Sequence, residues 1–105
     1  MPKKHRLTGA QIRGIRSSRR VHGTLFSLSI SPADGSVARC ACVVSKKVSP
    51  RAVVRNAVKR RCRAVLQKHV GTLRPGAYLF HAKREAAKAA FSDVAADIER
   101  VLGKI

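Results

Sequence analysis

Residues 49–63 read Ser-Pro-Arg-Ala-Val-Val-Arg-Asn-Ala-Val-Lys-Arg-Arg-Cys-Arg, the strongest structural pattern in the 105-residue chain. Ser49 followed by Pro50 is typical of a helix start, because the hydroxyl can cap the first turn and proline suits the first helical position. We expect the helix to run to about Val70 and to end at Gly71. At about 100° per residue, the apolar residues share one side and most basic ones the other, with Arg61 intruding on the apolar side. The pattern predicts a helix that packs on a sheet and exposes a basic stripe.

Strands are predicted both before and after this helix in the sequence. The stretches Leu25–Ile30 and Val37–Ser45 have strand character, and the Pro and Asp-Gly of residues 31–35 favour a turn between them. Together they predict a hairpin. After the helix and a turn at residues 74–76, the apolar run Ala77–Ala82 predicts a further strand.

Helices are predicted near the two ends of the chain. Thr8 can cap a short first helix, which follows a flexible basic arm at residues 1–7. Residues 85–105 predict an amphipathic helix whose core stripe is Ala90, Phe91, Val94, Ile98, Val101 and Leu102. The chain is too short for two cores, so residues 1–105 form a single domain. The order of helix, strands, helix, strand and helix predicts an α+β fold, a two-layer sandwich.

The charge of the chain is large and one-sided. There are 23 Lys and Arg against five Asp and Glu, a formal net charge of +18. Residues 1–84 hold 20 basic residues and one acid (+19), whereas residues 85–105 hold three basic and four acidic residues (−1). Nine basic residues and no acid lie between Lys46 and Lys68. A merely solubilising surface needs no such excess, so the charge favours a polyanionic partner.

Several protein classes are disfavoured by composition. With 45% hydrophobic residues the chain is not a disordered basic tail. It lacks an apolar run of about 18 residues and a secretory signal, so we expect neither a membrane span nor export. Its three cysteines are an odd number, which favours reduced thiols and a cytoplasmic location.

The candidate RNA-binding residues lie on the helix and just before it. Arginine suits this role because its planar fork meets phosphate oxygens in pairs and stacks on bases, and asparagine can both donate and accept hydrogen bonds. Lysines before the helix lie near its positive dipole end, which favours phosphate. The candidates are Lys46, Lys47, Arg51, Arg55, Asn56, Lys59, Arg60 and Arg63.

This stretch resembles the signature of the bacterial ribonuclease P protein subunit. The signature is roughly Arg-Asn-x-x-Lys-Arg-x-x-Arg on a helix, after Ser-Lys-Lys and Ala-Val. Here Ser45-Lys46-Lys47 and Ala52-Val53 are followed by Arg55, Asn56, Lys59, Arg60 and Arg63, which fill every fixed position. The segment Ala77-Tyr78-Leu79-Phe80 before a final amphipathic helix supports the resemblance.

The resemblance implies a four-stranded mixed sheet with three helices in the order αβββαβα, and a left-handed βαβ crossover. It implies a protein that binds the catalytic RNA of ribonuclease P and the 5′ leader of precursor tRNA, and so assists endonucleolytic removal of the leader in tRNA processing. In such a ribonucleoprotein the RNA subunit hydrolyses the bond with bound magnesium. We therefore expect no catalytic residue, metal or cofactor on this chain, and a monomer in the absence of RNA.

The candidates for the leader cleft are Ile12, Arg16 and Phe26. The family usually has an aromatic residue, mostly Phe, on the first helix facing the cleft, and this chain has Ile12 there. Base–aromatic stacking contributes about 1–3 kcal/mol per base, so leader contacts here are expected to rest more on charge and van der Waals packing. Phe26 could compensate, although a core role suits it better.

Catalytic and metal-site interpretations fit less well. No acid lies near His69 or His81 in the sequence except Glu85, so neither histidine has the pattern of an acid–base pair. Asp93 and Asp97 suit ordinary pairing on a helix with Arg100. The cysteines lack the Cys-x-x-Cys spacing of common zinc sites, which favours small buried thiols: Cys40, Cys42 and Cys62.

Two other nucleic-acid functions remain open. A small basic ribosomal protein, acting as a structural RNA clamp, needs the same kind of basic α+β surface. A DNA-binding recognition helix would have fewer arginines and more varied base-reading residues.

Overall fold

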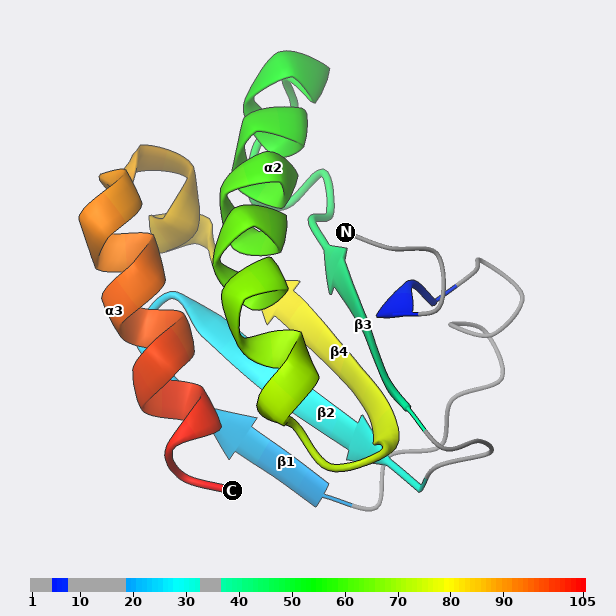
Figure 1. Cartoon of the computed structure of the whole chain (residues 1–105). Coiled ribbons are helices and arrows are strands. Elements are labelled where there is room, and N and C mark those ends of the chain that lie inside the picture. Colours follow the sequence, from blue (N-terminus) through cyan, green and yellow to red (C-terminus); the bar gives the residue numbers. More distant parts are fainter. Residues whose placement is uncertain (1–4, 8–18, 33–36) are drawn as a thin grey trace.

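The computed structural model describes residues 5–7, 19–32 and 37–105. The elements in order are β1 (Arg19–His22), β2 (Phe26–Ser31), β3 (Ala38–Val43), α2 (Ala52–His69), the 3₁₀ turn η2 (Val70–Thr72), β4 (Gly76–Ala82), the 3₁₀ turn η3 (Arg84–Lys88) and α3 (Phe91–Leu102). Both long helices cover the same face of one sheet (Figure 1). The α+β sandwich with a four-stranded mixed sheet is confirmed. The expected helix near Thr8 lies outside the described residues.

The strand order in the sheet is β1-β2-β4-β3. β2 pairs antiparallel with β1 and β4, and β3 pairs in parallel with β4. The predicted hairpin between the strands at 25–30 and 37–45 is therefore wrong, because β4 lies between them. The physical reason is burial: β4 buries Tyr78, Leu79 and Phe80, which point to both faces, and such a strand belongs in the centre of a sheet.

The connection from β3 through α2 to β4 is a parallel crossover between neighbouring strands. In Figure 1 both strands point upward with α2 in front of them, and the chain moves from β3 on the right to β4 on the left. This is the left-handed sense, which is rare among βαβ units. The left-handed crossover implied by the family resemblance is thus present.

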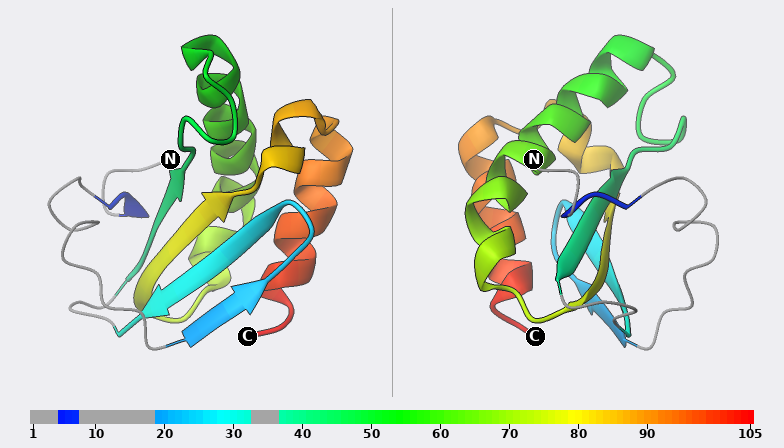
Figure 2. Two further views of the ribbon diagram at one scale, coloured as in Figure 1. Left: turned by 180° about the vertical axis from the view of Figure 1, so that it is seen from behind. Right: turned by 45° about the vertical axis from the view of Figure 1, so that its right-hand side comes forward.

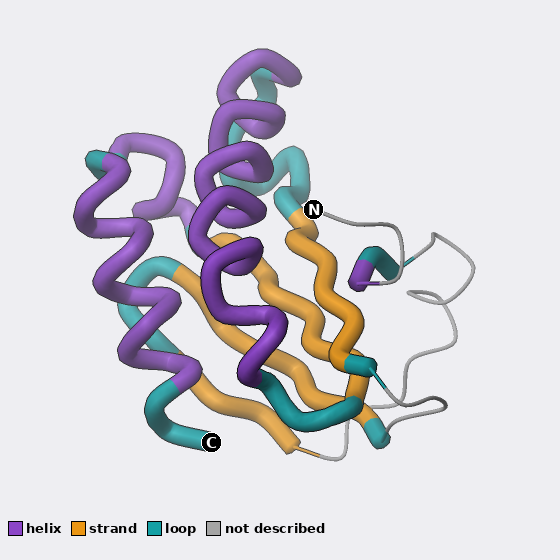
Figure 3. The backbone as a smooth tube through the Cα atoms, in the orientation of Figure 1, coloured by secondary structure: helices purple, strands orange, loops and turns teal. Residues whose placement is uncertain are grey.

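The core lies between the sheet and the two helices, which pack side by side (Figure 3). Phe26 and Phe80 meet edge to face in its centre, with ring centroids 6.4 Å apart. The helices contribute Val58, Cys62, Val65, Leu66, Val94, Ile98 and Val101. Two members of the predicted α3 stripe are not core residues: Ala90 and Phe91 are exposed. No helix in the described ranges is long and apolar enough to cross a membrane.

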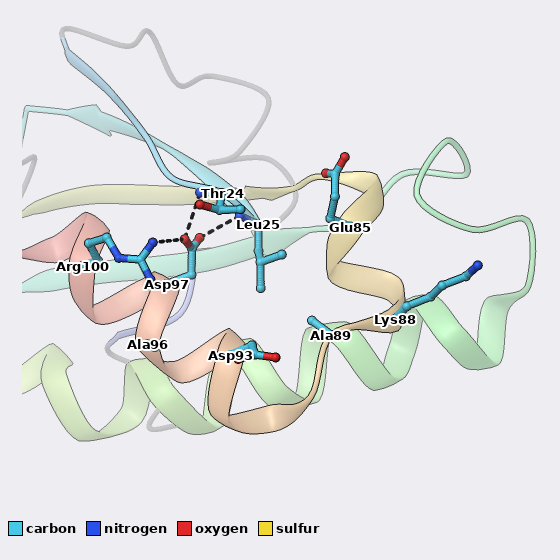
Figure 4. A pocket seen from close by; sticks show the side chains of 9 residues that line it. All are labelled: Thr24, Leu25, Glu85, Lys88, Ala89, Asp93, Ala96, Asp97 and Arg100. Atoms are coloured by element: carbon cyan, nitrogen blue, oxygen red, sulfur yellow. Dashed lines mark hydrogen bonds and ion pairs between the residues drawn. The ribbon is translucent and has the colours of Figure 1, made fainter.

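Asp97 of α3 fastens the turn between β1 and β2. Asp97 is 1% exposed, and its carboxylate oxygens accept hydrogen bonds from the backbone N–H groups of Thr24, Leu25 and Phe26 at 2.9–3.0 Å. Figure 4 shows the bonds to Thr24 and Leu25. The expected pairing with Arg100 is present at 3.5 Å, but it is secondary. Instead of an ordinary surface ion pair, Asp97 forms a buried cap on three backbone donors.

The described end of the N-terminal arm is held against the edge of the sheet. Arg6 forms a parallel bridge with Cys40, and the N–H of Leu7 donates to the Cys40 carbonyl at 3.2 Å. His5 Nδ1 lies 2.7 Å from the Ala38 carbonyl oxygen. Of the arm predicted at residues 1–7, the described residues 5–7 thus lie against β3.

Candidate nucleic-acid interface

The N-terminal end of α2 and the loop before it concentrate positive charge. α2 projects beyond the sheet at this end, next to the loop that follows β3 (Figure 1). Lys46, Lys47 and Arg51 are exposed there, and the first turn of α2 contains no acidic residue. The positive end of the helix dipole therefore adds to the side-chain charges. This end of the molecule is well suited to phosphate.

The start of α2 differs slightly from the prediction. The cap residue is Arg51 and the helix begins at Ala52, two residues later than the Ser-Pro pattern suggested. The Ser49 hydroxyl still acts near this end, because it accepts a hydrogen bond from the Arg51 backbone N–H at 3.2 Å. The side chain of Arg55 reaches back along the loop, and its Nη1 donates to the Ser49 carbonyl at 2.9 Å. Arg55 therefore helps to fix the loop as well as adding charge.

The outward side of α2 continues the basic surface along the helix. Asn56, Arg60 and Arg63 are exposed and follow one another at helical spacing, and Lys59 lies beside them half-buried. We call the eight candidates, Lys46, Lys47, Arg51, Arg55, Asn56, Lys59, Arg60 and Arg63, the α2 basic surface.

Ion pairing leaves this surface uncompensated. The salt bridges in the part of the chain that the structure describes join His69 to Glu99 and Arg100 to Asp97, and neither involves the α2 basic surface. Arg61, the basic residue predicted on the apolar side, donates to the carbonyl of Ala89, in the connection between η3 and α3, at 3.4 Å. The acids of the described residues thus leave the cations of the α2 basic surface without an ion-pair partner.

Val53 belongs to the same surface, although sequence reasoning did not single it out. It is 79% exposed, the most exposed large apolar residue in the described ranges, and it lies one turn before Asn56. Its spacing from Asn56 and Arg60 places it on the same side of the helix, which the sequence alone indicates. An exposed valine among exposed cationic side chains offers apolar surface beside the charges.

The leader-cleft candidates have different outcomes. Ile12 and Arg16 lie outside the described residues. Phe26 is fully buried on the helix-facing side of β2 and packs on Phe80, so it cannot stack on a leader base. The reason is strand alternation: because Phe26 and Leu28 point into the core, their neighbours point to the opposite face.

Neither α2 nor α3 covers that opposite face of the sheet (Figure 2). His22, Ser27 and His81 are direct cross-strand partners on it, and Arg20 pairs with Ser29 in the next row. Partial burial, followed by the charge of Arg20, lowers the pKa of His81. From β3, Arg39 points to the same face, with a buried Nε that has no hydrogen-bond partner among the described residues. Sequence reasoning missed these residues because it paired the strands incorrectly.

The cysteines form a buried group between β3 and α2. Cys40, Cys42 and Cys62 are free and at most 6% exposed. Burial raises the pKa of Cys40 to about 12, and the hydrogen bond with Cys42 together with burial raises the pKa of Cys62 well above its usual range. The thiols of Cys40 and Cys62 are therefore protonated at neutral pH. All three buried cysteines serve as small apolar side chains, as predicted.

Comparison with known proteins agrees with this arrangement. The family model for Ribonuclease P matches residues 1–105. The chain is 41% identical over 92 residues to the ribonuclease P protein component of Thermus aquaticus, which covers 86% of this chain and 52% of that protein. It is 37% identical over 107 residues to the ribonuclease P protein component of Nocardioides sp., covering 96% and 91%. The chain thus spans about half the length of the Thermus relative and nearly all of the Nocardioides one.

Solved structures share the fold. The RNase P protein of Staphylococcus aureus has a TM-score of 0.84 at 22% identity, covering 95% of this chain and 94% of that one. The RNase P protein from Thermotoga maritima has a TM-score of 0.74 at 17% identity, covering 83% of each. Since the family model matches along the whole length and two curated relatives exceed 35% identity, the chain belongs to the ribonuclease P protein family.

Proposed function

We propose that this chain is the protein subunit of a cytoplasmic ribonuclease P ribonucleoprotein, monomeric until it binds RNA. In this proposal it binds the catalytic RNA through the α2 basic surface and assists removal of the 5′ leader from precursor tRNA. The observation that carries the proposal is the α2 basic surface itself: seven cations and one amide on a single helix and the loop before it, with no carboxylate paired to them among the described residues.

The number of positive charges on the α2 basic surface supports a large RNA as the partner. Each phosphate that a Lys or Arg neutralises releases condensed counterions, so a surface of this charge gives strong, salt-sensitive binding. Arg60 and Arg63 are exposed and make no hydrogen bond or ion pair with another described residue, so their guanidinium groups are available to phosphate groups or base faces. Arg55 is half-buried against Ser49 and shapes the loop that carries Lys46 and Lys47.

The face of the sheet that α2 and α3 do not cover is the part of the described structure best suited to the 5′ leader. Its positive charges are Arg20 and Arg39, and its hydrogen-bonding groups include Ser27 and His81. Phe26 contributes nothing there because it is buried. A single strand bound on this face would be held by phosphate contacts and hydrogen bonds, with little base stacking.

In this proposal the hydrolytic step belongs to the RNA subunit, which would supply the magnesium chemistry. The chain's own acids suit a structural role: the Asp97 oxygens are already occupied by three backbone N–H groups, and Glu99 pairs with His69. His81 has an environment that disfavours its protonated form. The work of this chain is to bind and orient RNA.

Reconstitution tests the proposal. The purified chain is added to a bacterial ribonuclease P RNA at a magnesium concentration too low for the RNA alone, and 5′ processing of precursor tRNA is measured. We expect the chain to restore accurate 5′ cleavage and to cleave nothing without the RNA. A structural ribosomal RNA clamp would give no rescue, and cleavage by the repurified chain alone would overturn the assignment of catalysis to the RNA.

A further inference from the structure

At the end of the molecule opposite the N-terminus of α2 lies a groove of about 550 Å³. The η2 turn, the start of β1 and the C-terminal residues after α3 all lie at this end (Figure 1). The 18 residues of α2 span about 27 Å, at 1.5 Å per residue, so the groove is well separated from the Lys46–Arg51 end. We call it the C-terminal groove.

The lining of the C-terminal groove combines an apolar floor with a cationic rim. Ile30, Tyr78, Leu73 and Leu102 supply apolar surface, and Arg19 and Arg74 are exposed at its edge. Neither Asp nor Glu is among the described residues that line it. A groove for phosphate alone would not need the apolar floor, and a groove for an uncharged ligand would not need the two guanidinium groups.

One hydrogen bond holds the guanidinium group of Arg19, and a second holds the backbone of Arg74. Arg19 Nη2 donates to the Lys104 carbonyl at 2.9 Å, which uses one of the five N–H donors of the guanidinium. The Tyr78 hydroxyl donates to the Arg74 carbonyl at 2.7 Å, which ties the backbone of Arg74 to β4. The Arg19 side chain and the Arg74 backbone are therefore positioned before any ligand binds, and most of the Arg19 donors remain available.

A second cavity provides the contrast. It has a volume of about 360 Å³ and lies between η3, α3 and the β1–β2 turn. Its lining includes the carboxylates of Glu85, Asp93 and Asp97 beside Lys88 and Arg100 (Figure 4). Mixed charges of this kind repel phosphate about as much as they attract it. This second cavity thus lacks the charge complementarity to a polyanion that the C-terminal groove has.

We propose that the C-terminal groove binds one unstacked nucleotide of the RNA, with the base on the apolar floor and the phosphate between Arg19 and Arg74. The volume suits a nucleotide, since ligand pockets commonly measure about 300–1,000 Å³. The inference rests on the proposed function, because it takes the bound RNA as the source of the nucleotide. Two contact sites far apart on one rigid domain would also fix the orientation of the RNA and strengthen binding by linkage.

Nuclear magnetic resonance of the isotope-labelled full chain tests the ligand class. Adenosine monophosphate is titrated to millimolar concentration, with ribose 5-phosphate as the matched probe that lacks the base. We expect saturable shifts of the backbone amides of Thr72, Leu73 and Tyr78 with adenosine monophosphate, and clearly smaller shifts with ribose 5-phosphate. Unmoved groove signals, or equal shifts with both probes, would overturn the proposed base site.

Affinity for ribonuclease P RNA tests the role of the groove in the complex. Arg19→Ala and Arg74→Ala should each weaken binding about threefold to tenfold and lower the slope of log affinity against log salt by about 1. Lys88→Ala, which removes an exposed cation from the mixed-charge cavity, is the matched control and should stay within about twofold.

Arg60→Ala separates the two proposals. If Arg60→Ala weakens binding but Arg19→Ala and Arg74→Ala behave like Lys88→Ala, the groove is not an RNA contact while the proposed function stands. If none of the three arginine variants alters binding, both proposals fail.

Discussion

A Cβ atom on Gly23 would lie 2.7 Å from Oδ2 of Asp97, and also 2.5 Å from Val101 Cγ2. The close approach of α3 to the β1–β2 turn therefore requires glycine at position 23. It also explains how the Asp97 carboxylate reaches three successive backbone N–H groups. This contact holds α3 against the β1–β2 hairpin. Arg20 and His22 of that hairpin lie on the sheet face that we propose for the leader.

We predict that Asp97→Asn lowers the free energy of unfolding by about 2 kcal/mol or more, because hydrogen bonds to a buried charged group are strong and the amide places a donor against backbone donors. Asp93→Asn is the matched control on the exposed side of the same helix and should change stability by less than about 0.5 kcal/mol. Urea unfolding of both variants measures the difference. Equal stabilities would show that the buried carboxylate does not hold the turn.

Gly23→Ala should also destabilise the chain, by about 1–3 kcal/mol, because the methyl group forces Asp97 or Val101 to move. Gly71→Ala is the control, since a Cβ there meets nothing within 4 Å. Thermal unfolding compares the two variants. If Gly23→Ala unfolded at the same temperature as Gly71→Ala, the packing of α3 on the turn would be looser than described.

The positions of α2, β4 and α3 could be predicted from the sequence because their apolar periodicity and turn residues are local signals. The pairing of the strands could not be predicted in this way. Turn residues between positions 31 and 37 do not indicate whether β4 lies between β2 and β3 in the sheet. Asp97 was misjudged for a related reason: its spacing from Arg100 suits a surface pair, and only the fold brings the Thr24–Phe26 backbone against it. The α2 basic surface was predictable because its eight residues lie within 18 positions of one another.

Arg55→Ala and Arg60→Ala should differ in stability although both weaken RNA binding. Arg60 is exposed, so its removal should leave the free energy of unfolding unchanged within about 0.5 kcal/mol. Arg55 donates to the Ser49 carbonyl, and its loss should cost about 1 kcal/mol in addition. Urea unfolding followed by circular dichroism measures the stability of each variant, and titration with RNA measures its affinity. Collapse of the Arg60→Ala fold would mean that the stripe is structural.

His81 predicts a pH dependence of stability. Its folded-state pKa is lowered by burial and by Arg20, so below its ordinary value near 6.5 the unfolded chain takes up the proton first. The stability of the wild type should therefore fall, relative to His81→Gln, as the pH drops from 7.5 through 6.5 toward the folded-state pKa. Urea unfolding at several pH values measures this. A stability difference between the two proteins that does not change with pH would contradict the assigned environment of His81.

The salt dependence of binding to ribonuclease P RNA tests the central claim most directly. If the α2 basic surface neutralises about six phosphates, affinity should fall about a thousandfold between 50 and 200 mM monovalent salt, and Arg60→Ala should reduce the slope of log affinity against log salt by about 1. Affinity that barely changes with salt, or a slope that Arg60→Ala leaves unaltered, would contradict binding of RNA through this surface.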